Sequence, residues 1–139
     1  MPIQIKAFIA GFLSTLVFHQ GSALILYIMG IVNSAPFDMS PVEPLGIPKI
    51  FSISFFGGLW GVGLWSLIKR NKGLLRWVSA FFISGTLLTL VAFFIVFPLK
   101  EIHVDFLNPA IWFRGLFLNG MWGIGLVTFL SSNKIKTKE

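Results

Sequence analysis

The sequence predicts an all-α integral membrane protein, a four-helix bundle built from two parallel two-helix repeats. Of the 139 residues, 55% are apolar and only 12% are charged, whereas a soluble domain carries about 25% charged residues. The apolar residues gather into four long runs, and about 20 apolar residues in a helix span a bilayer core. Backbone in lipid must satisfy its own hydrogen bonds, so each run is expected to be a helix. Residues 1–139 therefore form a single transmembrane domain.

The repeats are visible as two patterns that each occur twice. The copies are FIAGFLSTLV at 8–17 and FISGTLLTLV at 82–91, then GLWGVGL at 58–64 and GMWGIGL at 120–126. We place repeat one at 6–72 and repeat two at 80–134. Because each repeat contains two helices, both enter the membrane in the same orientation, and a rotation of about 180° around the membrane normal is expected to superpose them.

The predicted spans are residues 7–31, 50–68, 74–97 and 110–130. The first run also has features of a secretory signal peptide, with Lys6 ahead of it and small residues at 21–23. The run continues past this point, and the internal third span copies it, so we expect a retained helix. The connection at 33–49 holds four prolines together with Asp38 and Glu43, which predicts a stiff, turn-rich segment. It is either a connector at the bundle mouth or a binding loop.

The distribution of basic residues predicts the orientation in the membrane. The connection between the second and third spans and the C-terminal tail are basic; their cations are Lys69, Arg70, Lys72, Arg76, Lys134, Lys136 and Lys138. By the positive-inside rule, both termini are cytoplasmic and the protein is a multi-pass component of a bacterial inner membrane. This rule accounts for the net charge of +6. The predicted partner is therefore the lipid bilayer, with a homo-oligomer or a membrane-protein partner open and nucleic acid excluded.

Small residues at helix-contact spacing predict how the helices pack. In lipid, such residues allow helix backbones to approach closely. The predicted packing residues are Gly11, Thr15, Gly57, Gly58, Gly61, Gly85, Thr89, Gly120 and Gly123. A glycine-lined permeation path is the alternative interpretation of the same pattern.

Polar side chains interrupt the repeat near the middle of the membrane. His19 and Gln20 occupy the positions at which the third span has Phe93 and Phe94, and Asn119 replaces a glycine of the second span. An ionisable residue inside a membrane is a functional candidate. We therefore predict a polar membrane centre of His19, Gln20 and Asn119.

His19 is expected to point into the bundle, because it shares a helical face with Gly11, Thr15 and Ser22. Its role is either structural, as a neutral imidazole bonded to Asn119, a carbonyl or a threonine, or functional, as a proton relay or ligand contact. Haem and metal binding are disfavoured, since the other histidine lies in an outer loop.

The outer loops contain further candidates, although no recognisable catalytic pattern. These candidates are Asp38, Glu43, His103, Asp105 and Arg114. Asp38, Glu43, His103 and Asp105 could converge as a weak metal or substrate site, but their spacing matches no ligand pattern. The chain has no cysteine and no HExxH or nucleophile-elbow motif. We expect no metal, no cofactor and no catalytic residue, and an enzyme is disfavoured.

Several short segments together resemble an uncharacterised family of small four-helix inner-membrane proteins of Gram-negative bacteria. The segments are FHQG at 18–21, APFDM at 35–39, LGIP at 45–48, GGLWG at 57–61, PLK at 98–100 and NGMWG at 119–123. The resemblance covers nearly the whole chain. It implies the location and the fold, and nothing about a substrate.

Two functions remain open on the sequence. In the first, the protein is a non-enzymatic membrane component that packs through its glycine-rich helix faces. In the second, it is a small transporter or channel with a polar centre near His19 and Asn119.

Overall fold

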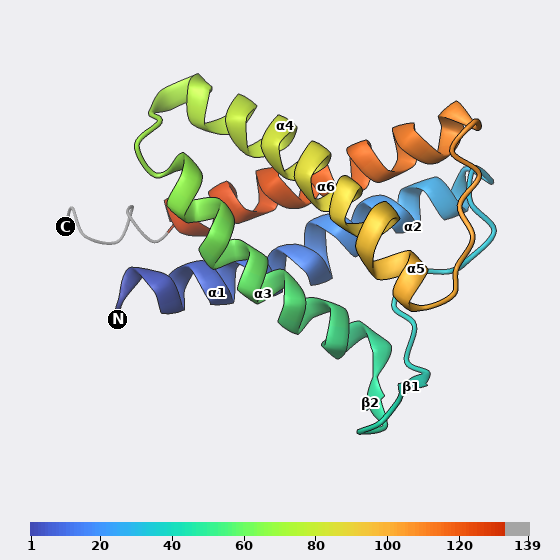
Figure 1. Ribbon diagram of the computed structural model, residues 1–139. Helices are drawn as coiled ribbons and strands as arrows, with labels where there is room; N and C mark the ends of the chain where they lie inside the picture. Colours follow the sequence, from blue (N-terminus) through green and yellow to red (C-terminus); the bar gives the residue numbers. More distant parts are fainter. Residues whose placement is uncertain (133–139) are drawn as a thin grey trace.

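The computed structural model describes residues 1–132, and their main elements are four long helical rods (Figure 1). The first rod comprises α1 (Ile3–Ser14), the π-helical turn η1 (Thr15–His19) and α2 (Gln20–Ile28). The second is α3 (Lys49–Ile68). The third comprises α4 (Gly73–Val91), the π-helical turn η2 (Ala92–Val96) and α5 (Phe97–Leu99), and the fourth is α6 (Pro109–Ser132). The predicted all-α four-helix class is confirmed.

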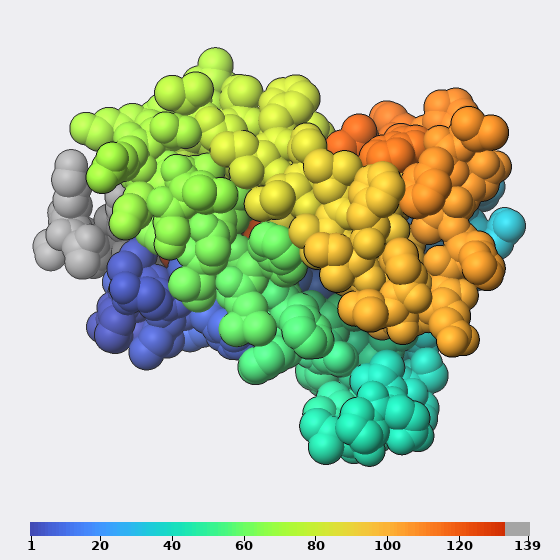
Figure 2. Space-filling view, in the orientation of Figure 1, coloured from blue at the N-terminus to red at the C-terminus, as the bar shows by residue number. Residues whose placement is uncertain are grey.

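The rods match the four predicted spans, with ends that differ by a few residues. The first rod ends at Ile28 rather than at residue 31, because Gly30 adopts a left-handed conformation with φ of 71°. The N–H groups of Gly30 and Ile31 then bond back to the carbonyls of Tyr27 and Leu26, which closes the helix end. The following connection contains one short antiparallel hairpin, β1 (Pro41–Val42) and β2 (Ile47–Pro48). It projects beyond the helices (Figure 2).

The two ends of the bundle differ in what they carry. The start of α1, the turn between α3 and α4 and the end of α6 lie at one end, here called the terminal end (Figure 1). The hairpin connection and the segment between α5 and α6 lie at the other, here called the loop end. The predicted basic tail with Lys134, Lys136 and Lys138 lies outside the described residues.

Glycines bring α1 against α3 and α4 against α6. A Cβ atom on Gly11 would collide with the carbonyl oxygen of Gly57, and one on Gly61 with the carbonyl oxygen of Ala7. In the second pair, a Cβ atom on Gly123 would collide with the carbonyl oxygen of Ala80. The other predicted packing residues lie at the same interfaces: Gly58 faces the Phe8 ring, Gly120 faces the Phe81 ring, Gly85 faces the Leu116 carbonyl, Thr15 lies against Gly57 and Thr89 lies against Gly115.

Contacts between the two halves are less alike than contacts within them. α1 packs closely along α6, whereas α3 and α4 contact each other much less. A strict two-fold axis would make these two interfaces equal. The superposition of the halves therefore stays a prediction, supported by the interfaces within each half and opposed by those between them.

The buried core lies toward the terminal end. Its members are Ala10, Leu64, Ile68, Ala80, Trp122, Leu126, Val127 and Leu130. The outer surface is also apolar: Phe56, Phe82 and Phe113 are 58%, 65% and 63% exposed. Within residues 1–132, four helices are long and apolar enough to cross a bilayer, and such a surface suits lipid. The chain is thus a multi-pass membrane protein.

Candidate functional site

Trp122 links α6 to the first rod inside the bundle. Its indole N–H donates to the carbonyl oxygen of Gly11 at 3.0 Å and to the hydroxyl of Thr15 at 3.1 Å. The Ser14 hydroxyl donates to the carbonyl oxygen of Trp122. The indole is only 1% exposed. Trp122 and its three hydrogen bonds, here called the Trp122 layer, belong to the buried core. Sequence reasoning missed it, although a deep tryptophan in lipid signals a need for an acceptor.

Gln20 is buried more deeply than its neighbour His19 in the first rod. Gln20 is 7% exposed, while His19 is only partly buried. Gly11, Thr15 and Ser22 of the predicted face are buried, and a π-helical turn begins at Thr15. A π-helical turn inserts an extra residue into the helix, and Gln20, directly after this turn, is buried as well. That His19 itself points inward stays a prediction, because the structure gives His19 partial burial and a contact with the buried Gln20.

Gln20 attaches the first connection to the helix. Its Oε1 atom accepts a hydrogen bond from the backbone N–H of Phe37 at 2.8 Å. Its amide nitrogen lies 3.2 Å from Nδ1 of His19 and donates to it in the tautomer protonated at Nε2. Phe37 has a φ of 59°, which is uncommon for a residue other than glycine. His19 thus orients Gln20, and Gln20 fixes the loop where its backbone turns.

Asn119 has hydrogen-bond partners different from those of this pair. Its side-chain amide donates to the Thr89 hydroxyl at 2.9 Å, and its backbone carbonyl oxygen accepts from the Ser84 hydroxyl at 2.8 Å. Both partners belong to α4. Among the described residues, no hydrogen bond joins Asn119 to His19 or Gln20. Asn119 therefore joins α4 to α6, while His19 and Gln20 serve the loop.

Asp38 organises the loop above Gln20. Its carboxylate accepts from the backbone N–H and hydroxyl of Ser40 and forms an ion pair with Lys49 at 3.4 Å. The Ser40 hydroxyl, followed by the Ser40 N–H and the Lys49 ammonium, lowers the pKa of Asp38 below its ordinary value. Asp38 is therefore charged at neutral pH. Its own carbonyl oxygen accepts from the N–H of Ile50 and so satisfies the start of α3.

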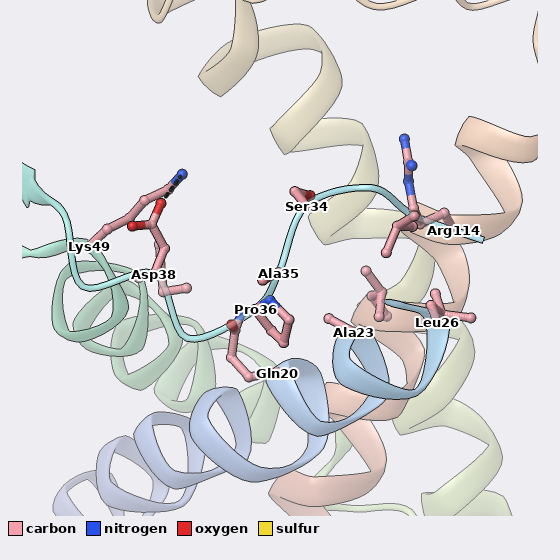
Figure 3. Close-up of a pocket in the computed structure, with 12 residues that line it drawn as sticks. Gln20, Ala23, Leu26, Ser34, Ala35, Pro36, Asp38, Lys49 and Arg114 are labelled. Carbon is pink, nitrogen blue, oxygen red and sulfur yellow. Dashed lines mark hydrogen bonds and ion pairs between the residues drawn. The ribbon is translucent and has the colours of Figure 1, made fainter. Parts of the chain in front are cut away.

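An open pocket of about 320 Å³ lies between this loop and the helices (Figure 3). Its lining residues are Gln20, Ala23, Leu26, Val32, Ser34, Ala35, Pro36, Asp38, Lys49, Ile53, Arg114 and Leu118. Gln20 points from α2 toward Pro36, the Asp38–Lys49 pair lies at one side, and Arg114 lies at the other. The pocket thus brings together Gln20, Asp38 and Arg114 from the predicted residues. Lys49 was not predicted as a site residue, although a lysine that begins a helix next to an acidic loop can indicate an ion pair.

The remaining outer-loop candidates do not line the pocket. Glu43 and His103 are exposed, and Asp105 accepts from the N–H of Leu107 at 3.1 Å in a local turn. In residues 1–132, no three His, Cys, Asp or Glu side chains are grouped as metal ligands. The outer-loop residues therefore do not converge into the single site that the sequence left open.

Arg114 is the charge in the pocket that has no partner among the described residues. The ion pair found in this part of the chain uses Lys49 and Asp38. Arg114 is partly buried and lies on α6, five residues after Pro109, or roughly 7.5 Å along the axis. A guanidinium remains protonated and offers five donors. The pocket can therefore supply a fixed positive charge close to apolar walls.

No protein-family model, curated protein or solved structure matches the chain, so the geometry of the pocket is the basis for its function.

Proposed function

We propose that the protein is a non-enzymatic component of a bacterial inner membrane that binds a small solute in the loop-end pocket. The carrying observation is the contrast between the two ends of the bundle. The terminal end is filled with buried apolar side chains, and the loop end has an open pocket that combines an apolar wall with a few polar and charged side chains. Small-molecule sites are concave, largely apolar and fixed by a few polar groups, as this pocket is.

The glycine-rich faces are already used within the chain. This argues against docking of a partner through the glycines and leaves the pocket as the better candidate for binding. Gly11, Gly57, Gly61 and Gly123 all face helices of the same chain at distances that leave no room for a Cβ atom. Their close packing is therefore used to build the bundle. A homo-oligomer or a membrane-protein partner would need a different surface.

The orientation belongs to this proposal. The basic turn between α3 and α4 favours a cytoplasmic terminal end and an outward loop end. The likeness to small four-helix inner-membrane proteins, which rests on segments such as 35–39 and 57–61, favours the same membrane. The paired motifs and the matched glycine interfaces favour two parallel repeats.

Cysteine labelling tests the orientation and the pocket together, because the chain has no cysteine of its own. In spheroplasts treated with a membrane-impermeant maleimide, Ser34→Cys should label quickly and Ala23→Cys, in the pocket wall, more slowly. Lys72→Cys should label only after lysis. Gly63→Cys is the control, since its position is exposed on the outer surface and has no neighbour within 4 Å. In lipid, its thiol cannot ionise and should not react.

Two results would contradict the proposal. Labelling of Lys72→Cys in sealed spheroplasts would reverse the orientation. Complete protection of Ala23→Cys, at a level equal to the Gly63→Cys control, would show that water does not enter the pocket.

Transport is the second candidate, because the hydrogen-bonded pair Gln20–His19 extends from the pocket into the first span. The buried Trp122 layer opposes it by closing the bundle below. We therefore expect liposomes containing the protein to show no uptake across a panel of ions and small solutes. Uptake that disappears in His19→Phe would instead establish transport. The variant should fold, since Phe93 occupies the matched position of the third rod.

A further inference from the structure

We propose that the ligand of the loop-end pocket is a small amphipathic anion whose phosphate or carboxylate group binds Arg114. This inference rests on the proposed function and names the chemical class of the solute. It is carried by three properties of the pocket: its uncompensated charge, its apolar wall and its size.

The first property is charge. Lys49 already pairs with Asp38 at 3.4 Å, on the side of the pocket opposite Arg114 (Figure 3). Arg114 has no such partner among the described residues, so it leaves the pocket with a net positive charge. Placing a charged side chain within the membrane costs free energy unless the charge contacts water or an opposite charge. The planar guanidinium can donate two parallel hydrogen bonds to two oxygens of a phosphate or carboxylate.

The polar neighbours show that the negative group should sit at Arg114. Gln20 already uses its oxygen for Phe37 and its nitrogen for His19. The Asp38 carboxylate on the far side would repel an anion. Ser34 lines the pocket between the two sides and is exposed, so its hydroxyl can add a donor.

The second and third properties describe the rest of the ligand. The apolar wall consists of Ala23, Leu26, Val32, Ala35, Pro36, Ile53 and Leu118. A ligand that fills the pocket therefore has an apolar body behind its acid group. The volume of about 320 Å³ lies at the small end of the roughly 300–1,000 Å³ that small-molecule pockets occupy. Such an anion could be a soluble metabolite or the phosphate headgroup of an anionic lipid.

The test uses the full chain purified in dodecyl maltoside, with butyl phosphate as the soluble probe and butanol as its uncharged match. Binding is measured by calorimetry. Arg114→Gln should weaken the affinity for butyl phosphate about 10- to 100-fold, as expected for losing charge-assisted hydrogen bonds. Lys100→Gln is the control, because it removes one positive charge at the same end without touching the pocket. It should leave the affinity unchanged, and Arg114→Lys should be intermediate.

The lipid source is tested by native mass spectrometry of the protein released from nanodiscs of phosphatidylglycerol or phosphatidylcholine. Retention of phosphatidylglycerol that Arg114→Gln abolishes would support the inference and identify a lipid headgroup, even if butyl phosphate does not bind. Equal binding by wild type and Arg114→Gln, or no binding of either anion, would overturn it. Far-UV circular dichroism confirms that Arg114→Gln is folded. If neither anion binds but Ala23→Cys still reacts with the maleimide, water enters the pocket and only the proposed ligand class is wrong.

Discussion

Gly61→Val should prevent stable formation of the bundle, whereas Gly63→Val, two positions along the same helix, should not. The Cα atom of Gly61 faces α1, and a Cβ atom there would collide with the carbonyl oxygen of Ala7 and lie 3.0 Å from the Cα atom of Gly11. These are backbone atoms, so no rotamer change relieves the collision. Overpacking costs about 1–3 kcal/mol and sometimes more, and we expect at least about 3 kcal/mol here because whole helices must separate.

Gly63→Val is the matched control for Gly61→Val. Gly63 has no neighbouring atom within 4 Å of an added Cβ atom. A side chain there also removes the entropic cost of a helical glycine, worth roughly 0.5–1 kcal/mol. Gly63→Val should therefore be neutral or slightly stabilising. The measurement is the free energy of unfolding in a titration of dodecyl maltoside micelles with SDS. Equal stability of the two variants would mean that α1 and α3 do not pack through Gly61.

Trp122→Ala should cause the other large loss of stability, about 3–5 kcal/mol, the usual cost of truncating a buried tryptophan. The indole is 1% exposed and joins α6 to the first rod through Gly11 and Thr15. Trp122→Phe keeps most of the ring but loses the N–H group. Intramembrane hydrogen bonds contribute about 0.6 kcal/mol on average and at most about 1.7 kcal/mol. We therefore expect Trp122→Phe to lose between about 1 and 2 kcal/mol.

Trp60→Ala is the matched control, since Trp60 occupies the same position of the repeated motif but is only partly buried. It should lose less than half as much as Trp122→Ala in the same unfolding titration. A loss equal to that of Trp122→Ala would show that both tryptophans are structural to the same degree. In that case the halves would be more symmetric than the unequal contacts between them indicate.

The fold could be predicted because it depends on composition and spacing. Four apolar runs define four helices in lipid, and small residues such as Gly11 and Gly61 define the faces that meet. The helix ends were harder, because the end at Ile28 depends on the left-handed conformation of Gly30. The short hairpin pairing Val42 with Ile47 also depends on a turn that an apolar pattern does not report.

The site could be predicted only in part. Gln20, Asp38 and Arg114 were recognised as polar groups in unusual places, but not as neighbours of one pocket. The π-helical turn at Thr15–His19 is not encoded by a recognisable residue pattern, so the deeper burial of Gln20 next to His19 was missed. The partner of Asn119 depends on how α4 crosses α6. Lys49 and Leu118 enter the pocket only through three-dimensional packing.

The solid terminal end has a consequence for how the protein would respond to its surroundings. A pocket that opens at one end, above a plug of Trp122, Leu126 and Leu130, exchanges molecules with a single compartment. At equilibrium, its occupancy follows the concentration of ligand in that compartment and is independent of the pool across the bilayer. On the proposed function, the protein would respond to a ligand on one side of the membrane even when the same compound is abundant on both.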